Sequence, residues 1–212
     1  MKIAEVTQLA ISEITVIRFA RFHDHRGFFT EHYRESDVSR HEGLECLRGI
    51  RFVQMNESFS RAGTIRGLHF QWNPYMGKLV RCVSGRMIDL VLDIRKGSPT
   101  FGQILAYDMP GRWDAEWSEW IWVPPGFAHR NLFTEDSVIE YFCAGEYSQG
   151  CEAGISPLSL DIDWSLCAPS LKAIFDQLAA TTDRISSKDR LAPGVTSWAA
   201  DPRSENFVFG PL

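Results

Sequence analysis

Two of the six histidines lie in segments that could present a reactive side chain. His69 stands in GTIRGLHFQ (63–71) and His129 in VPPGFAHRN (123–131). An imidazole ionises near neutral pH, so it can take or give a proton during a reaction. A plainer interpretation stays open for each: His69 as a hydrogen-bonded core residue on an apolar strand, and His129 as the end of a turn after two prolines.

Gln71 and Lys78 bear on whether these histidines bind a metal. The segments around His69 and His129 resemble the paired motifs of the cupin superfamily, whose metal-binding members add a second histidine and a glutamate. Gln71 and Lys78 occupy those two positions here. A lysine ammonium has no lone pair to donate and repels a cation. We therefore expect a cupin-like barrel with no metal and no cofactor, suited to acid–base chemistry on an anionic or carbonyl substrate.

A closer resemblance extends over about residues 14–193. The chain is similar to the dTDP-4-dehydrorhamnose 3,5-epimerase family in segments that follow the family's order: FHDHRGFFTEHY (22–33), FVQMNESFS (52–60), IRGLHFQ (65–71), GKLVRCVSG (77–85), DLVLDIRKGSPTFG (89–102), WVPPGFAH (122–129) and SSKD (186–189). The resemblance implies an isomerase that inverts C3, C5 or both in a nucleotide-linked 4-keto-6-deoxyhexose, with dTDP as the expected nucleotide. It also implies a homodimer and a place in deoxysugar biosynthesis of the dTDP-L-rhamnose type.

The resemblance assigns four catalytic residues. A proton beside a ketone can be removed only when the enolate oxygen is stabilised, so the reaction needs a base, an electrophile and an acid on the opposite face. These roles match His69, Lys78 and Tyr141, with Asp189 in SSKD as the carboxylate that orients the base. Counting forward from His129 would instead place Phe142 at the acid position. Neighbouring strand residues face opposite ways, so only one of the two can point into the barrel, and we favour Tyr141.

The resemblance also implies a set of binding residues. Around the nucleotide sugar it places Arg26, Glu31, Gln54, Asn56, Arg66, His129, Glu152 and Lys188, with Tyr147 stacked on the base. An arginine guanidinium can give a diphosphate two parallel hydrogen bonds, which favours Arg26 and Arg66 for that role. The chain departs from the family at Arg130, where glycine is usual, and at Met55, where aspartate is common.

Two other functions remain open from the sequence. One is a single-centre epimerase or a ketoisomerase that acts on another nucleotide-linked keto sugar. The other is a catalytically silent cupin that binds a nucleotide sugar, which would be favoured if Phe142 rather than Tyr141 faced the cavity. A metal-dependent oxygenase is disfavoured by Gln71 and Lys78.

Short strands are expected to position these residues. From residue 14 to residue 143, segments rich in β-branched and aromatic residues alternate with Gly, Pro, Asn and Asp, which is typical of a sandwich or barrel. Met87–Asp93 is apolar on both faces and is expected to be a central strand. We predict an all-β, cupin-like jelly roll of two antiparallel sheets with short helices at 31–39 and 169–180. We expect residues 1–212 to form one domain, with an irregular surface tail at 194–212.

Composition narrows the class of partner. The formal net charge is −5, with 22 basic and 27 acidic residues, so no overall positive field favours nucleic acid. No apolar run approaches the roughly 20 residues of a membrane span. The five cysteines form no C-x-x-C pair, and a reducing cytoplasm is the expected location. The remaining histidines lie in a polar stretch and are expected to be exposed: His23, His25, His32 and His41.

Overall fold

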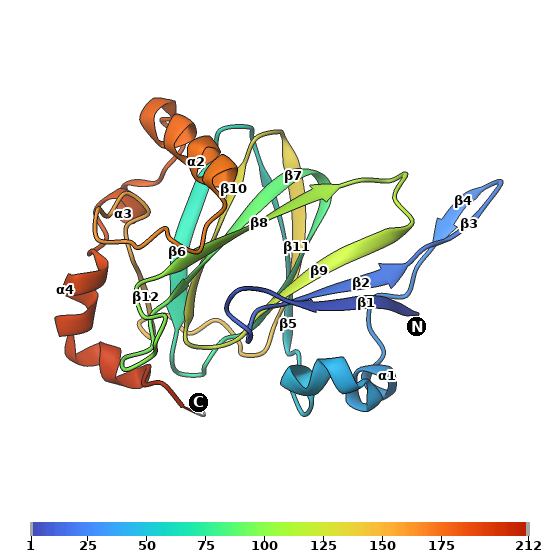
Figure 1. Cartoon of the computed structure of the whole chain (residues 1–212), viewed down its shortest axis with the longest axis horizontal. Coiled ribbons are helices and arrows are strands. Elements are labelled where there is room, and N and C mark those ends of the chain that lie inside the picture. Colours follow the sequence, from blue (N-terminus) through green and yellow to red (C-terminus); the bar gives the residue numbers. More distant parts are fainter. Residues whose placement is uncertain (1, 211–212) are drawn as a thin grey trace.

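The structure, a computed structural model, describes residues 2–210 and consists mainly of strands (Figure 1). The strands are β1 (Ile3–Gln8), β2 (Thr15–Ala20), β3 (Phe22–Asp24), β4 (Gly27–Phe29), β5 (Gln54–Ser60), β6 (Ile65–Gln71), β7 (Lys78–Asp93), β8 (Ile104–Gly111), β9 (Trp117–Val123), β10 (Phe127–Phe133), β11 (Ser137–Cys143) and β12 (Glu152–Gly154). The helices are α1 (Glu35–Arg40), α2 (Pro169–Thr181), α3 (Ser187–Arg190) and α4 (Val195–Ala200), with 3-10 turns η1 (Glu42–Leu47) and η2 (Pro202–Asn206).

The long strand β7 belongs to two antiparallel sheets. Its first half, from Lys78, pairs with β9 and β11 in a sheet of order β1-β2-β9-β7-β11-β5. Its second half, up to Asp93, pairs with β8 and β10 in a sheet of order β8-β7-β10-β6-β12. The two sheets face each other across one buried cluster, to which β7 contributes Val80 and Val91. The prediction of an all-β, cupin-like fold with two antiparallel sheets is confirmed.

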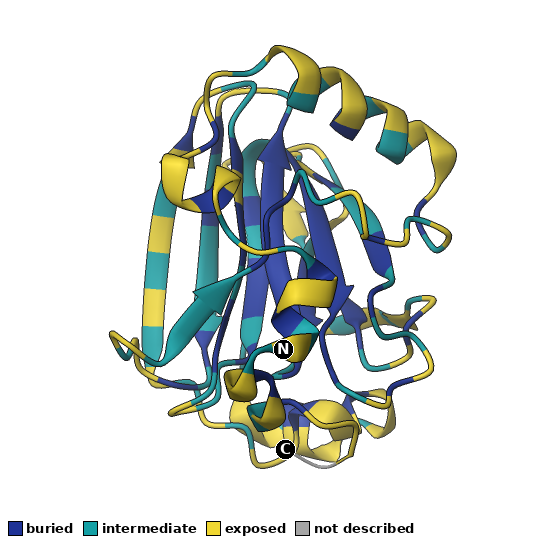
Figure 2. Cartoon of the chain, turned by 90° about the vertical axis from the view of Figure 1, so that its left-hand side faces the viewer, coloured by how far each residue is buried: buried dark blue, intermediate teal, exposed yellow. Residues whose placement is uncertain are grey.

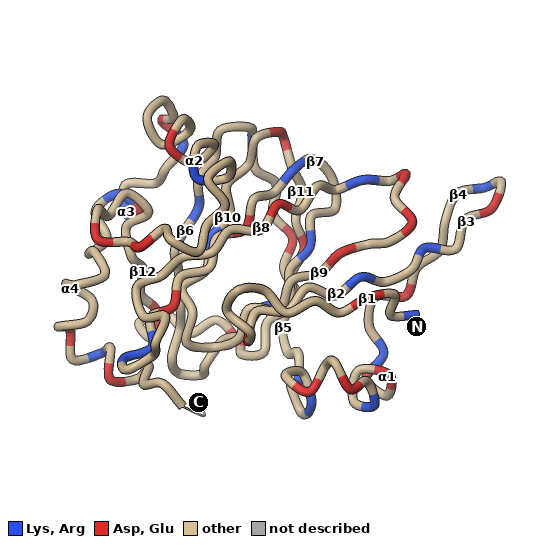
Figure 3. The backbone as a smooth tube through the Cα atoms, in the orientation of Figure 1, with Lys and Arg blue, Asp and Glu red and all other residues tan. Residues whose placement is uncertain are grey.

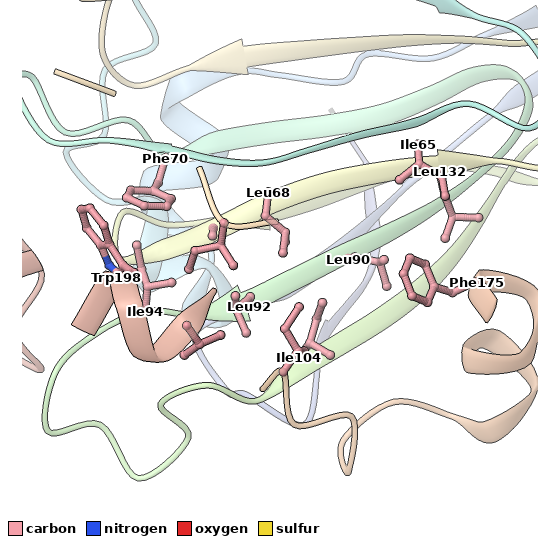
Figure 4. Packing of buried hydrophobic residues seen from close by; sticks show 14 of the residues in the cluster. Ile65, Leu68, Phe70, Leu90, Leu92, Ile94, Ile104, Leu132, Phe175 and Trp198 are labelled. Carbon is pink, nitrogen blue, oxygen red and sulfur yellow. The ribbon is translucent and has the colours of Figure 1, made fainter. Parts of the chain in front are cut away.

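The second half of β7 is buried on both faces, as its sequence predicts. Val91 points into the barrel, whereas Leu90 and Leu92 pack in a cluster on the outer face of the same sheet. Helix α2 covers that cluster with Phe175, which points at the strands near Leu132 (Figure 4). Figure 2 shows buried central strands, while the helices around them expose their outward faces. This sheet is therefore held between the barrel interior and a helical layer.

The expectation of an irregular tail from residue 194 was wrong. Residues 195–200 form α4 and residues 202–206 form η2, and the side chains of Trp198 and Phe207 are 0% exposed. Trp198 packs edge-on against Phe70, at 4.7 Å between ring centroids (Figure 4). The Asp161 carboxylate accepts the first backbone N–H groups of α4. A helix this short shows no hydrophobic period, so the sequence pattern missed it. Residues 211–212 lie outside the described part.

A hairpin of β3 and β4 projects from the body of the fold (Figure 1). His23 and His25 are exposed there, as expected. The same expectation was wrong for His32 and His41, which are partly buried. His32 packs against the Trp120 ring at 5.4 Å, and His41 accepts a hydrogen bond from a backbone N–H in η1.

Charged residues of both signs are interspersed along the chain (Figure 3). Among residues 2–210, no helix is long and apolar enough to cross a membrane.

Candidate active site

Two adjoining cavities lie between the sheets, with volumes of about 460 and 440 Å³. His69, Lys78 and Tyr141 line both of them. His69 comes from β6 in one sheet and Tyr141 from β11 in the other, so they stand on opposite walls. Lys78 begins β7, the strand that the sheets share. The strand arrangement thus brings Tyr141 to the same cavities as His69 and Lys78, which lie much earlier in the chain.

Asp189 lies against the edge of β6. Strand β12 pairs with β6 only as far as His69, and the Ile155 backbone N–H then donates to Leu68. Beyond that point the Asp189 carboxylate takes the next place along the edge. Its Oδ2 accepts from the Gly67 backbone N–H at 3.2 Å, and its Oδ1 lies 2.7 Å from His69 Nε2. These hydrogen bonds hold the pKa of Asp189 below its usual value, against the effect of burial.

The His69–Asp189 contact fixes the proton on the imidazole. With Asp189 buried and ionised, Nε2 carries the proton and donates it, which leaves a lone pair on Nδ1. The His69 side chain is 37% exposed, so a molecule in the cavity can reach it. A histidine with an oriented ring and one free nitrogen can act as a general base.

The amine of Lys78 lies on the cavity wall without an ion-pair partner among the described residues. Within the described residues, no carboxylate lies within 4.0 Å of its ammonium group, although Asp89 and Glu152 are near enough to act on it through space. Burial lowers the pKa of Lys78 below that of an ordinary lysine. An ammonium without a carboxylate partner, on the cavity wall, can stabilise an oxyanion that forms on a bound molecule.

Tyr141 and Phe142 point to opposite sides of β11. Tyr141 lines both cavities, and burial raises the pKa of its phenol, which therefore carries its proton at neutral pH. Phe142 packs outside the barrel, stacked on Trp120 at 5.6 Å and close to Phe52. The structure thus gives the cavity a tyrosine hydroxyl, which can donate a proton, on the wall opposite His69.

Known proteins share this fold and much of this sequence. The family model described as dTDP-4-dehydrorhamnose 3,5-epimerase matches residues 8–197. The chain belongs to this family. The enzyme of that name from Pseudomonas aeruginosa is 40% identical over 167 residues, 76% of this chain and 87% of the relative. The Salmonella typhimurium enzyme is 35% identical over 192 residues, 89% of this chain and 93% of the relative.

A solved structure extends the similarity to the whole chain. The dTDP-6-deoxy-D-glucose-3,5-epimerase of Legionella pneumophila, in complex with dTDP-4-keto-L-rhamnose, superposes with a TM-score of 0.78 at 30% identity. The match covers 98% of this chain and 99% of that one. The predicted membership in the dTDP-4-dehydrorhamnose 3,5-epimerase family is confirmed, and so is an enzyme of the epimerase class.

In this family member a second histidine–aspartate pair, in which both residues are buried, lies on the neighbouring strands, and only its histidine was predicted from the sequence. His129 Nε2 is 2.5 Å from Asp89 Oδ1, which also accepts from the Asn131 side chain at 2.7 Å. Asp89 is 0% exposed, and its other oxygen has no hydrogen-bond partner among the described residues. The sequence does contain a signal for Asp89, because a charged residue inside the apolar run of β7 needs a buried partner.

The predicted binding residues fall into two groups. Gln54, Asn56, Tyr147 and Glu152 line the second cavity, whereas Arg66, His129 and Lys188 line the first. Several of them are connected: the Tyr147 backbone N–H donates to Gln54 Oε1 at 2.9 Å, and Glu152 accepts from Tyr147 Oη and Lys188 Nζ. Tyr147 is 57% exposed, so a face of its ring is open for stacking.

Arg26 and Glu31 are not part of either cavity. Arg26 lies at the exposed tip of the β3–β4 hairpin and pairs with Asp24 at 2.6 Å, at the opposite end of the fold from α3 (Figure 1). Glu31 follows the hairpin and pairs with Arg34 at 2.7 Å. A single copy of this epimerase-family chain does not bring them to His69.

The side chain of Gln71 forms hydrogen bonds with the backbone of two loops. Its amide donates to the Pro74 and Glu146 backbone oxygens and accepts from the Ser148 N–H, so it ties two loops together. Within residues 2–210 no group of three or more His, Cys, Asp or Glu side chains is placed to hold a metal ion.

Proposed function

We propose that this protein inverts C3 and C5 of dTDP-4-keto-6-deoxyglucose, without a cofactor. One observation carries the proposal: His69, oriented by Asp189, faces Tyr141 across a cavity that also holds Lys78. The reaction needs a base on one face of the sugar, an acid on the other and an electrophile for the enolate oxygen. These three side chains supply those groups.

The proposed mechanism begins with the base. His69 Nδ1 removes the proton from the carbon beside the C4 ketone, and the Asp189 carboxylate stabilises the imidazolium that forms. Lys78 donates a hydrogen bond to the ketone oxygen as it becomes an enolate. Tyr141, on the opposite wall, protonates the same carbon from the other face, and the stereocentre is inverted. Each inversion removes one proton from the carbon and adds one, with no change of oxidation state, and proton exchange with solvent then returns His69 and Tyr141 to their starting forms before the second carbon reacts.

The binding residues are proposed to hold the rest of the substrate. Arg66, beside the first cavity, suits the diphosphate because its guanidinium can form two parallel hydrogen bonds. Tyr147 offers an open ring to the base, while Gln54, Asn56, His129, Glu152 and Lys188 provide polar contacts along the two cavities. Aromatic stacking tolerates any base, so the choice of nucleotide depends on the polar contacts.

Proton NMR of dTDP-4-keto-6-deoxyglucose in deuterated water tests the proposal. With the wild-type protein, the C3 and C5 proton signals should disappear and signals of the inverted sugar should grow. His69→Ala should abolish both changes. Exchange at one carbon alone would make the protein a single-centre epimerase. No exchange, with tight binding of the nucleotide sugar, would leave a silent binding protein and would overturn the proposal.

We further propose a homodimer, located in the cytoplasm, in which Arg26 and Glu31 bind the substrate held by the partner. The support is their position: each lies away from the cavities of its own chain, on a projecting segment with exposed Phe22 and Phe29. Light scattering should give twice the mass of the chain. Arg26→Ala and His69→Ala, each inactive alone, should recover activity when mixed, because one site of the mixed dimer then carries both native residues.

If mixed dimers form but activity does not recover, Arg26 lies outside the partner's site.

A further inference from the structure

Arg130 is a buried cation without a hydrogen-bond partner. It follows His129 on β10, and its side chain is 2% exposed. Within residues 2–210 none of its three guanidinium nitrogens has a hydrogen-bond partner. A buried charge is costly unless something near it compensates, so a guanidinium in this state calls for an explanation.

Packing against an aromatic ring compensates part of the cost of burying Arg130. The Arg130 guanidinium lies 5.1 Å from the centre of the Phe175 ring, which points from α2 at the sheet (Figure 4). Attraction between a cation and an aromatic face increases when both are shielded from water. The ring is neutral, however, and it leaves the full positive charge in place.

The carboxylate that acts on Arg130 is that of Asp189. Arg130 on β10 is the register partner of Gly67 on β6, and the Gly67 N–H holds Asp189 Oδ2 at 3.2 Å. Arg130, Asp189 and His69 all line the first cavity. The attraction of Asp189 acts on Arg130 through space, with no direct hydrogen bond between them.

We propose that Arg130 is a positioning residue for the His69–Asp189 pair: its charge offsets part of the Asp189 charge and thereby weakens the hold of that carboxylate on a proton at His69. The inference rests on the proposed role of His69 as the base. A carboxylate that orients an imidazole also favours its protonated form, which cannot accept a proton from the substrate. A fixed cation behind the carboxylate weakens that second effect and leaves the hydrogen bond intact.

Arg130 is suited to this role because it is charged and unscreened. Burial lowers its pKa to about 9, so it remains cationic at neutral pH. Other charged or titratable groups surround the pair: Arg66, Lys78, Asp89, His129, Tyr141 and Glu152 on strands, Lys172 on α2, and Arg184, Lys188 and Arg190 around α3. Arg66, Arg184, Lys188 and Arg190 are exposed, and solvent weakens their effect.

The pKa of His69, measured by NMR with labelled histidine, tests the inference without substrate. His69→Gln assigns the signal. In Arg130→Met, which keeps the length of the side chain and removes its charge, the pKa of His69 should rise by about one unit. In Arg130→Lys it should stay near the wild-type value. With substrate, the acid limb of the kcat/KM profile should move upward by the same amount in Arg130→Met alone.

Phe175→Leu is the matched control. It removes the ring against the guanidinium and keeps the charge, so it should lower Tm and leave the pKa of His69 unchanged. If Arg130→Met does not fold, the neutral Arg130→Gln takes its place. An unchanged His69 pKa in a folded neutral variant would overturn the inference, as would an equal rise in Arg130→Lys. Because this titration needs no turnover, failure of the proposed epimerase activity would be seen separately.

Discussion

Asp189 binds both the side chain of His69 and the strand that carries it. The two residues are 120 positions apart, yet Oδ1 of Asp189 lies 2.7 Å from the imidazole while Oδ2 accepts the Gly67 backbone N–H. One carboxylate therefore fixes the ring relative to its own backbone. His69 is held at two points, which leaves its free nitrogen in a defined direction.

Asp189→Asn should lower kcat by roughly a hundredfold or more and change KM little, because the amide can present its N–H to Nε2 and favour the wrong tautomer. Asp183→Asn changes an exposed carboxylate on the same segment and should have wild-type kinetics. Steady-state assays of both variants check this. A rise in KM with unchanged kcat would assign Asp189 to substrate binding.

Lys78→Met should reduce kcat by about 10²- to 10³-fold, since the enolate oxygen loses its cationic donor. In the wild type, activity requires protonated Lys78, whose pKa is lowered by burial. The alkaline limb of the pH–rate profile should therefore lie below the pH at which an ordinary lysine loses its proton. Lys78→Arg should move that limb upward. A limb that stays in place in Lys78→Arg would assign it to another group.

Tyr141→Phe should separate the two halves of the reaction. Without the phenolic proton donor, His69 can still remove a proton and return a deuteron to the same face. Deuterium should enter the substrate with retention, while the inverted product falls by at least about tenfold. Phe142→Leu, on the outer side of β11, should keep full activity and lose about 1 kcal/mol of stability. Equal loss of exchange and inversion in Tyr141→Phe would contradict this division.

His32 should make the fold sensitive to acid. Its pKa is lowered to about 4, first by burial and then by the charges of Arg81 and Arg21. Between the usual histidine pKa near 6.5 and that value, the unfolded chain binds a proton that the folded chain does not, so stability falls as the pH falls. The loss should be at most about 3 kcal/mol. Urea unfolding at several pH values should show a smaller loss in His32→Phe, and an unchanged one in the exposed His23→Phe.

Trp198→Ala should destabilise the protein by about 3–5 kcal/mol, because the indole is fully buried against Phe70 and Phe207. Phe70 follows His69 directly, so the cavity left behind also loosens the strand of the base. Thermal unfolding measures the loss. Ser197→Ala, an exposed neighbour on α4, should leave Tm within error of the wild type.

The strands were predictable from the sequence, whereas the tail and one buried acid were not. The run Met87–Asp93 identified a central strand because its residues are apolar on both faces, which is typical of a strand that is buried on both sides. Trp198 gave no such signal, since its helix is too short for a period and its partners lie far away in the chain. The place of Asp89 beside the site is seen only from its contact with His129, which lies on the adjacent strand.

The cavity residues show the same division. Neighbouring residues on a strand face opposite ways, so the pattern could offer either Tyr141 or Phe142 and only the register of β11 decides between them. Arg26 and Glu31 matched the family segment, yet strand pairing directs the hairpin that carries Arg26 away from the cavities, and Glu31 follows that hairpin. A linear motif does not tell where the strands will place the residues that it contains.

Because β7 belongs to both sheets, its position in the chain determines when the barrel can form during translation. Every strand that pairs with β7, from β8 to β11, follows it before residue 144, so a ribosome releases the whole barrel interior in one continuous stretch. Asp189, Trp198 and Phe207 emerge only afterwards. Domains begin to fold as their segments leave the ribosome. We therefore expect a nascent barrel that assembles before Asp189 orients His69, so that the His69–Asp189 pair forms only after residue 189 has left the ribosome.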